Sequence, residues 1–115
     1  MKVTRFADAK PYVAHNHYDM RSLRLQGFES GGPEKFWTGL SHFLPGGGAG
    51  PDSSPLEKVY VMLAGEMTIK VGDQEFVLRA MDSCCIPGGE TREAQNNGNQ
   101  VATMLVVMPN PESKS

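Results

Sequence analysis

Several side chains that could take part in chemistry lie in the segment PDSSPLEKVYVMLAGEM, residues 51–67. Asp52, Ser54 and Lys58 offer a carboxylate, a hydroxyl and an amine just before an apolar strand, and Tyr60 follows Lys58 on the same face of that strand. Polar groups at the start of a strand are either solvated loop or the rim of a pocket. In a pocket, groups of these types can bind a ligand and transfer protons.

The elements that must position these groups are short strands. Thirteen glycines and eight prolines punctuate the chain, which is typical of strands joined by tight turns. We expect strands at residues 21–28, 36–44, 58–64, 66–71, 75–80, 84–86 and 101–108. This spacing predicts an all-β fold, an antiparallel barrel or sandwich, in a single domain. Strands 58–64 and 101–108 are apolar on both faces, so we expect one face of each to be covered, within the subunit or in a homodimer.

The composition is that of an ordinary globular protein. The 115 residues are 39% hydrophobic and 21% charged, which allows one modest core. The net charge of −2 argues against a nucleic-acid partner, and the chain has no apolar run long enough to span a membrane. We expect no secretory signal. The adjacent Cys84 and Cys85 should point to opposite faces of one strand as free thiols, which favours a reducing cytoplasm.

Glycines, a proline and an asparagine at fixed spacings resemble the two sequence motifs of the cupins, which are small jelly-roll-like β-barrel proteins. The matching positions are Gly46, Gly65, Pro87, Gly89 and Asn96. Met81 stands where the second motif begins with glycine. The resemblance implies a cupin-type β-barrel over residues 36–108. It leaves residues 1–35 as an N-terminal strand and arm that packs on the barrel or on a dimer partner, and residues 109–115 as a polar tail.

The same resemblance implies a metal site whose usual ligands have been replaced. Where cupins have two histidines, a glutamate and a third histidine, this sequence has Asp52, Ser54, Lys58 and Arg92. Three imidazoles and a carboxylate suit iron, manganese, zinc or nickel, whereas two cations repel a divalent metal. We therefore expect neither a metal nor another cofactor. Glu57 could face the barrel instead of Lys58 if the strand carries a bulge.

In a cupin barrel these replaced positions converge at one open end, which predicts a pocket for a small anionic organic molecule. Arg92 would bind a carboxylate, and Lys58, close to Arg92 and partly desolvated, would act as a base or as an imine-forming nucleophile. Tyr60 would supply a proton and Asp52 would balance the charge or act as a second acid–base group. Ser54 would contact the ligand.

Further side chains are candidates for the wall or for catalysis. Trp37, Met62 and Met67 are expected in the core or the pocket wall. His42 shares a face with two leucines and could point into the barrel as a general base. His15 and His17 have the spacing of metal ligands on an extended arm, but a surface arm packing on a neighbouring subunit is the favoured interpretation.

Three functions remain open at this stage. Lyase, isomerase or decarboxylase chemistry through a carbanion or enolate, without a metal, is favoured. A non-catalytic ligand-binding or sensory cupin would be favoured if Asp52 closes the mouth by pairing with Lys58 and Arg92. A metal-dependent cupin would need a non-standard site, formed by His42 with Asp52 or by His15 and His17 of the arm.

Overall fold

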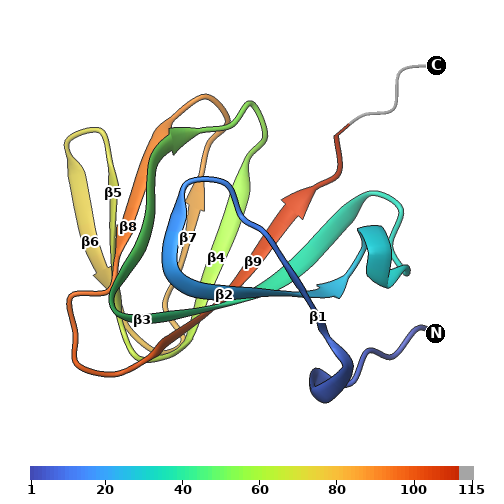
Figure 1. Ribbon diagram of the computed structural model, residues 1–115. Coiled ribbons are helices and arrows are strands. Elements are labelled where there is room, and N and C mark those ends of the chain that lie inside the picture. Colours follow the sequence, from blue (N-terminus) through green and yellow to red (C-terminus); the bar gives the residue numbers. More distant parts are fainter. Residues whose placement is uncertain (112–115) are drawn as a thin grey trace.

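The computed structural model describes residues 1–111, which form a nearly closed β-barrel (Figure 1). The strands are β1 (Lys10–Tyr12), β2 (His17–Gln26), β3 (Phe36–Ser53), β4 (Lys58–Ala64), β5 (Met67–Val71), β6 (Gln74–Leu78), β7 (Ser83–Ile86), β8 (Thr91–Gln95) and β9 (Ala102–Pro109). They are joined in the order β6-β5-β8-β3-β9-β4-β7, with β2 added to β3 and β1 to β2. Short 3-10 turns occupy Phe6–Asp8 and Phe28–Ser30. The all-β prediction is confirmed.

The long strand β3 connects the two halves of the barrel. Its residues 36–43 pair with β9 and its residues 48–53 pair with β8. The sequence predicted that the strand would stop near residue 44, yet it continues through PGGGAGP. Glycine makes this possible, because a Cβ at Gly47 would collide with the backbone of Asp19 and one at Gly48 with the backbone of Ala94.

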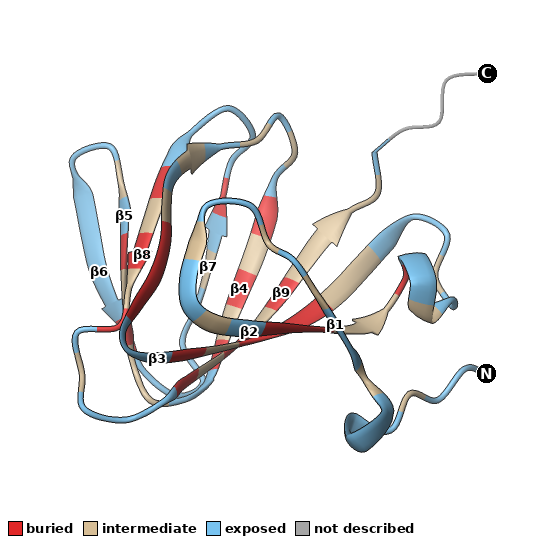
Figure 2. Ribbon diagram, viewed as in Figure 1, coloured by how far each residue is buried: buried red, intermediate tan, exposed pale blue. Residues whose placement is uncertain are grey.

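The core lies between these two halves, and Figure 2 shows in red the stretches of the strands that are buried. Met62 and Met67 are fully buried, as are Phe43 and Met104. Cys84 packs against this core while Cys85 is exposed, and both are free thiols, as expected from their adjacent positions. No helix in the described part of the chain is long and apolar enough to cross a membrane.

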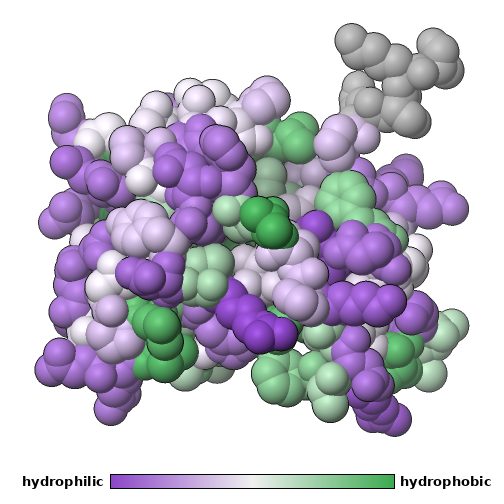
Figure 3. Space-filling model, viewed as in Figure 1, coloured by the Kyte–Doolittle hydropathy of each residue, from purple (hydrophilic) through white to green (hydrophobic). Residues whose placement is uncertain are grey.

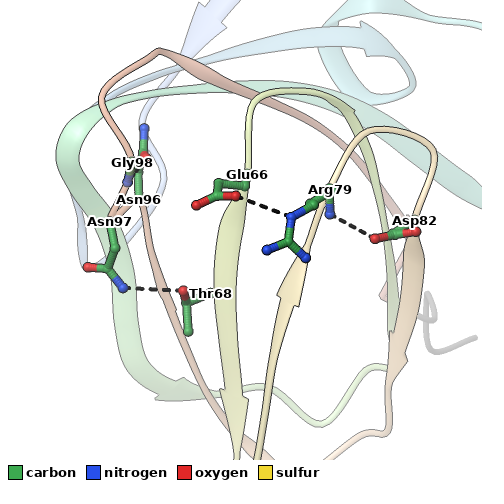
Figure 4. A network of polar contacts seen from close by, with 7 residues as sticks. All are labelled: Glu66, Thr68, Arg79, Asp82, Asn96, Asn97 and Gly98. Carbon is green, nitrogen blue, oxygen red and sulfur yellow. Dashed lines mark hydrogen bonds and ion pairs between the residues drawn. The ribbon is translucent and has the colours of Figure 1, made fainter.

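One end of the barrel is closed by polar contacts among the connections that follow β4, β6 and β8 (Figure 4). Asn96 is 1% exposed; its Nδ2 donates to the Phe43 carbonyl at 3.0 Å, and its Oδ1 accepts from the Gly98 amide at 2.9 Å. Beside it, Arg79 Nε lies 3.5 Å from Glu66 Oε2. The first residues of β4 and β8 lie at the opposite end, where the sequence predicted the pocket.

The N-terminal segment crosses the barrel and is anchored through a cation (Figure 1). The guanidinium of Arg24 lies 3.7 Å from the centre of the Tyr12 ring, 4.6 Å from Trp37 and 4.7 Å from Phe28, and its Nε is 3.0 Å from Glu29 Oε1. These contacts hold β1 on the barrel. On the face seen in Figure 3, small hydrophobic patches are separated by hydrophilic side chains.

Residues 1–35 are predicted from the sequence to be an N-terminal strand and arm that packs on the barrel or on a dimer partner. β2 belongs to the sheet, because it pairs with β3 from His17 to Gln26. Part of the expected tail, residues 112–115, lies outside the described residues.

Candidate active site

A cavity of about 180 Å³ lies inside the barrel, beside the first residues of β4 and β8. Its polar lining consists of Tyr12, His17, Ser41, Lys58, Tyr60 and Arg92. The rest of the wall is apolar or aromatic and includes Trp37, Met104 and Val106. Of the predicted site residues, the structure therefore brings together Lys58, Tyr60, Arg92 and Trp37.

Arg92 is a buried cation that forms no ion pair among the described residues. It is 5% exposed, and its Nε and Nη1 are buried without a hydrogen-bond partner. No carboxylate of residues 1–111 lies within ion-pair distance of it. Gly50 provides the space, because a Cβ there would lie 3.0 Å from Arg92 Nη1. A buried charge without a partner is costly, so this guanidinium is suited to bind an anion.

Lys58 is a second buried cation on the same cavity. It is 6% exposed and forms no ion pair with a carboxylate of the described residues, whereas Glu57 is exposed. The strand therefore presents Lys58, not Glu57, to the barrel. Burial lowers the pKa of the Lys58 amine, and the positive charge of Arg92 lowers it further, while Asp52 opposes both effects.

Tyr60 provides a protonated hydroxyl next to these cations. It is 3% exposed, and burial raises the pKa of its phenol to about 12, against the opposing effect of the Arg92 charge. The phenol therefore stays protonated at neutral pH and can donate a hydrogen bond or a proton. It follows Lys58 by two residues on β4, which is why both side chains face the cavity.

His17 belongs to the site, although the sequence interpretation assigned it to a surface arm. Its Nδ1 lies 2.6 Å from the His15 carbonyl oxygen. A carbonyl only accepts, so Nδ1 carries the proton and Nε2 of the neutral ring keeps its lone pair. Burial lowers the pKa of His17, and the charges of Arg92 and Lys58 lower it further, against the His15 hydrogen bond and Asp52, which raise it. A neutral imidazole with a fixed tautomer can act as a base.

Asp52 and Ser54 do not reach the cavity. Asp52 Oδ1 accepts a hydrogen bond from the amide of Ser53 at 2.9 Å, and the Asp52 carboxylate forms no ion pair with Lys58 or Arg92 in the described structure. The alternative in which Asp52 closes the mouth by pairing with Lys58 and Arg92 is therefore not what the described structure has. Ser54 Oγ accepts a hydrogen bond from the Leu56 amide at 3.1 Å and shapes the turn before β4.

His42 lies on the outer side of the barrel, so the expectation that it points inward is wrong. Its neighbours Ser41 and Phe43 line the cavity, and side chains alternate along a strand. His42 Nδ1 lies 3.1 Å from Thr103 Oγ1, and its ring packs edge-on against Phe6 at 6.0 Å between centroids. Met62 and Met67, expected in the core or the wall, are in the core rather than on the cavity.

The polar residues that line the cavity do not fit a metal ion. Among residues 1–111, no three histidine, cysteine, aspartate or glutamate side chains are grouped so that they could hold one. Two of the lining side chains, Lys58 and Arg92, are cationic groups. Two cations beside the cavity repel a divalent metal.

Solved structures of similar shape support the barrel assignment. The polyketide cyclase RemF from Streptomyces resistomycificus superposes with a TM-score of 0.83 at 21% identity, over 95% of this chain and 79% of that chain. A predicted oxalate decarboxylase from Thermotoga maritima gives 0.78 at 21% identity, over 96% and 100%. A cupin-2 domain protein from Rhodospirillum rubrum gives 0.80 at 14% identity, over 96% and 76%. At these identities the likeness concerns the fold alone.

Two sequence comparisons identify the family. The chain is 42% identical over 111 residues to a Mycobacterium tuberculosis protein named beta-D-galactosidase, and the match covers 96% of each chain. The family model for the cupin domain matches residues 39–108. That range contains every strand from β3 to β9 except the first residues of β3 and the last residue of β9. The chain belongs to the cupin family.

Proposed function

We propose that this protein is an enzyme that binds a small organic anion in the barrel cavity and transfers protons beside its carboxylate without a metal. The observation that carries the proposal is the pair of buried cations, Arg92 and Lys58, which no carboxylate of the described residues neutralises. An anionic ligand would supply the missing charge. Its carboxylate would be held where both cations withdraw electron density from the adjacent carbon.

The other polar groups suit acid–base chemistry on such a ligand. His17 is neutral with a free Nε2, so it can remove a proton from the carbon beside the carboxylate. Arg92 and Lys58 then stabilise the enolate-like charge that develops. Tyr60 can return a proton to the product or to a leaving group. This sequence of steps is common to lyases, isomerases and decarboxylases that pass through a carbanion or enolate.

Proton exchange tests the proposal without knowledge of the physiological substrate. In D₂O, NMR should show that the protein exchanges the proton beside the carboxylate of at least one acid from a panel of keto and hydroxy acids. The exchange should be lost in His17→Gln, while binding is retained. His42→Ala, outside the cavity, is the matched control and should exchange as the parent does. Binding without exchange across the panel would instead indicate the non-catalytic module.

Lys58 could alternatively attack a keto acid, since its lowered pKa favours the free amine. Borohydride added with a bound keto acid would then leave a stable adduct on Lys58. Mass spectrometry of the wild type and of Lys58→Met distinguishes this route, because only the wild type would gain the mass of the reduced imine. An unmodified wild type would leave Lys58 as an anion-binding group.

Hydrolysis of β-galactosides is a second candidate, favoured by the 42% identity to the protein named beta-D-galactosidase. Most glycosidases use a pair of carboxylates, and no aspartate or glutamate is among the described residues that line the cavity. An aryl β-D-galactoside supplies the test. Release of the aryl group by the wild type, undiminished in Arg92→Met, would favour hydrolysis at a site that does not depend on the cations.

A further inference from the structure

We infer that the ligand is a sugar acid, and that the cavity cleaves a uronic acid bearing a second sugar on its O4 by β-elimination, with His17 as the base and Tyr60 as the acid. This inference rests on the proposed function and names its substrate class. Three observations support it: the mixed polar and aromatic lining of the cavity, the two cations in that lining, and the absence of a carboxylate among the described lining residues.

The lining of the cavity matches a sugar ring, which has hydroxyl edges and an apolar face. Arg92, Lys58 and other polar groups line the cavity, and so do the rings of Trp37 and Tyr12. These two rings meet edge to face at 5.9 Å, and Arg24 is packed against both. At about 180 Å³ the space is below the roughly 300–1,000 Å³ of sites for drug-sized ligands, so it suits the uronic acid ring alone, and the second sugar on O4 must lie outside the cavity.

The paired cations indicate that this ring carries a carboxylate. A neutral galactoside would leave the guanidinium of Arg92 and the amine of Lys58 without a counter-charge in a buried site. A uronic acid has the same ring with a carboxylate at C6. It would therefore complete the site, whereas the matching neutral sugar would not.

The same side chains favour elimination over hydrolysis. Hydrolysis of a glycoside commonly uses two carboxylates, which the described lining of the cavity lacks. Elimination needs a base, an acid and cations on the carboxylate, and the cavity presents all three. His17 Nε2 takes the proton from C5, the electrons of that C–H bond form the C4=C5 double bond, and the C4–O bond breaks. The departing sugar oxygen takes the proton of the Tyr60 hydroxyl. The step consumes no water and needs no oxidant or reductant.

Matched sugars test the substrate class through binding alone. Calorimetry should show that galacturonate binds the wild type at least about a hundredfold more tightly than galactose, because a buried charge contact is worth that much. Arg92→Met should abolish the preference, and Arg92→Lys should restore part of it. Thermal denaturation of each variant shows whether it is folded. Equal binding of galactose and galacturonate would overturn the inference.

Di- and trigalacturonate test the reaction. The expected product has the ultraviolet absorbance of an unsaturated uronate and gains no ¹⁸O from labelled water. Galactobiose, which lacks the carboxylate, is the control and should not be cleaved. His17→Gln and Tyr60→Phe should bind galacturonate but lose the absorbance change. Saturated, ¹⁸O-labelled products, or no cleavage by a wild type that binds galacturonate, would contradict elimination.

The outcomes separate this inference from the proposed function. If keto or hydroxy acids bind in an Arg92-dependent way but galacturonate does not, the sugar-acid inference is wrong while the anion site remains. If no acid binds in an Arg92-dependent way, both fail.

Discussion

Arg92 and Lys58 give the site its character because both are buried and neither has an anionic partner in the described structure. Burial and the neighbouring guanidinium both lower the pKa of Lys58. The same positive surroundings, together with burial, lower the pKa of His17. The two cations therefore have two effects. They form a site for an anion, and they favour the neutral form of the His17 imidazole, which is the form that acts as a base.

The lowered pKa of His17 predicts how stability depends on pH. In the unfolded chain the pKa of this histidine is near 6.5, and in the folded protein burial lowers that pKa. Between the two values the unfolded state binds more protons, so His17 makes the fold less stable as the pH falls below 6.5. The contribution is fully present above that value. Urea unfolding at pH 7.5 and 5.5 should show a smaller loss of stability in His17→Gln than in the wild type.

The His17→Gln comparison has an internal control. His15 and His42 are present in both proteins, so any contribution they make cancels in the difference. An equal loss of stability in the two proteins would mean that the imidazole of His17 is not held neutral by its surroundings.

At the scale of elements, the bend of β3 makes room for the guanidinium. Gly50 has φ +84°, and a Cβ there would collide with the Arg92 carbonyl and lie 3.0 Å from Arg92 Nη1. Gly89 has the same φ, but a Cβ there would meet nothing within 4 Å. Gly89→Ala should lower the free energy of unfolding only by the strain of a left-handed backbone conformation, about 1–2 kcal/mol. Gly50→Ala should lower the free energy of unfolding, measured with urea, by about 1–3 kcal/mol more than Gly89→Ala does. It should also weaken anion binding.

Equal unfolding free energies for Gly50→Ala and Gly89→Ala would show that β3 does not depend on the close approach to β8. Unchanged anion binding in a folded Gly50→Ala would show that Arg92 does not need that space.

The strands with clean alternation could be predicted from the sequence, and β4 begins and ends where expected. β8 was not predicted, because its sequence, TREAQ, is polar and turns a charged side chain, Arg92, toward the interior. The prediction that His42 on β3 faces the barrel interior is wrong. Leu40, which shares the outer face with His42, is only 7% exposed. Because both faces of this strand carry buried apolar residues, the sequence does not distinguish the inner face from the outer one.

The site could be predicted where cupin spacing fixes a position, as for Lys58 and Arg92. His17 could not be assigned in this way, because its place on the cavity depends on the long-range pairing of β2 with Ala49 of β3. Nothing in the local sequence determines that pairing. Asp52 and Ser54 occupy the expected strand end. There, however, one oxygen of each side chain accepts a hydrogen bond from a nearby backbone amide.

At the scale of the whole molecule, we expect a homodimer that uses the outer side of β4 and β9. Val59 and Val61 of β4 lie opposite Val107 and Leu105 of β9, and all four are half-buried on the face away from the core. Such an apolar stripe is typical of an interface. Light scattering at micromolar concentration should give twice the chain mass of 12.5 kDa, about 25 kDa.

Val61→Lys would place a charge in the middle of this stripe and should give a folded monomer that still binds the anion. A wild-type monomer would contradict the expected dimer, as would a dimer that Val61→Lys leaves intact.

The central claim is that Arg92 and Lys58 are retained for an anion and not for stability. The most direct test is to measure the unfolding free energy and the affinity for the tightest-binding acid of the panel in Arg92→Met and Lys58→Met. Both variants should be at least as stable as the wild type without ligand, because a partnerless buried charge has been replaced by an apolar chain. Both should lose about 2–4 kcal/mol of binding free energy. Variants that are destabilised but bind the acid as tightly as the wild type would contradict the claim.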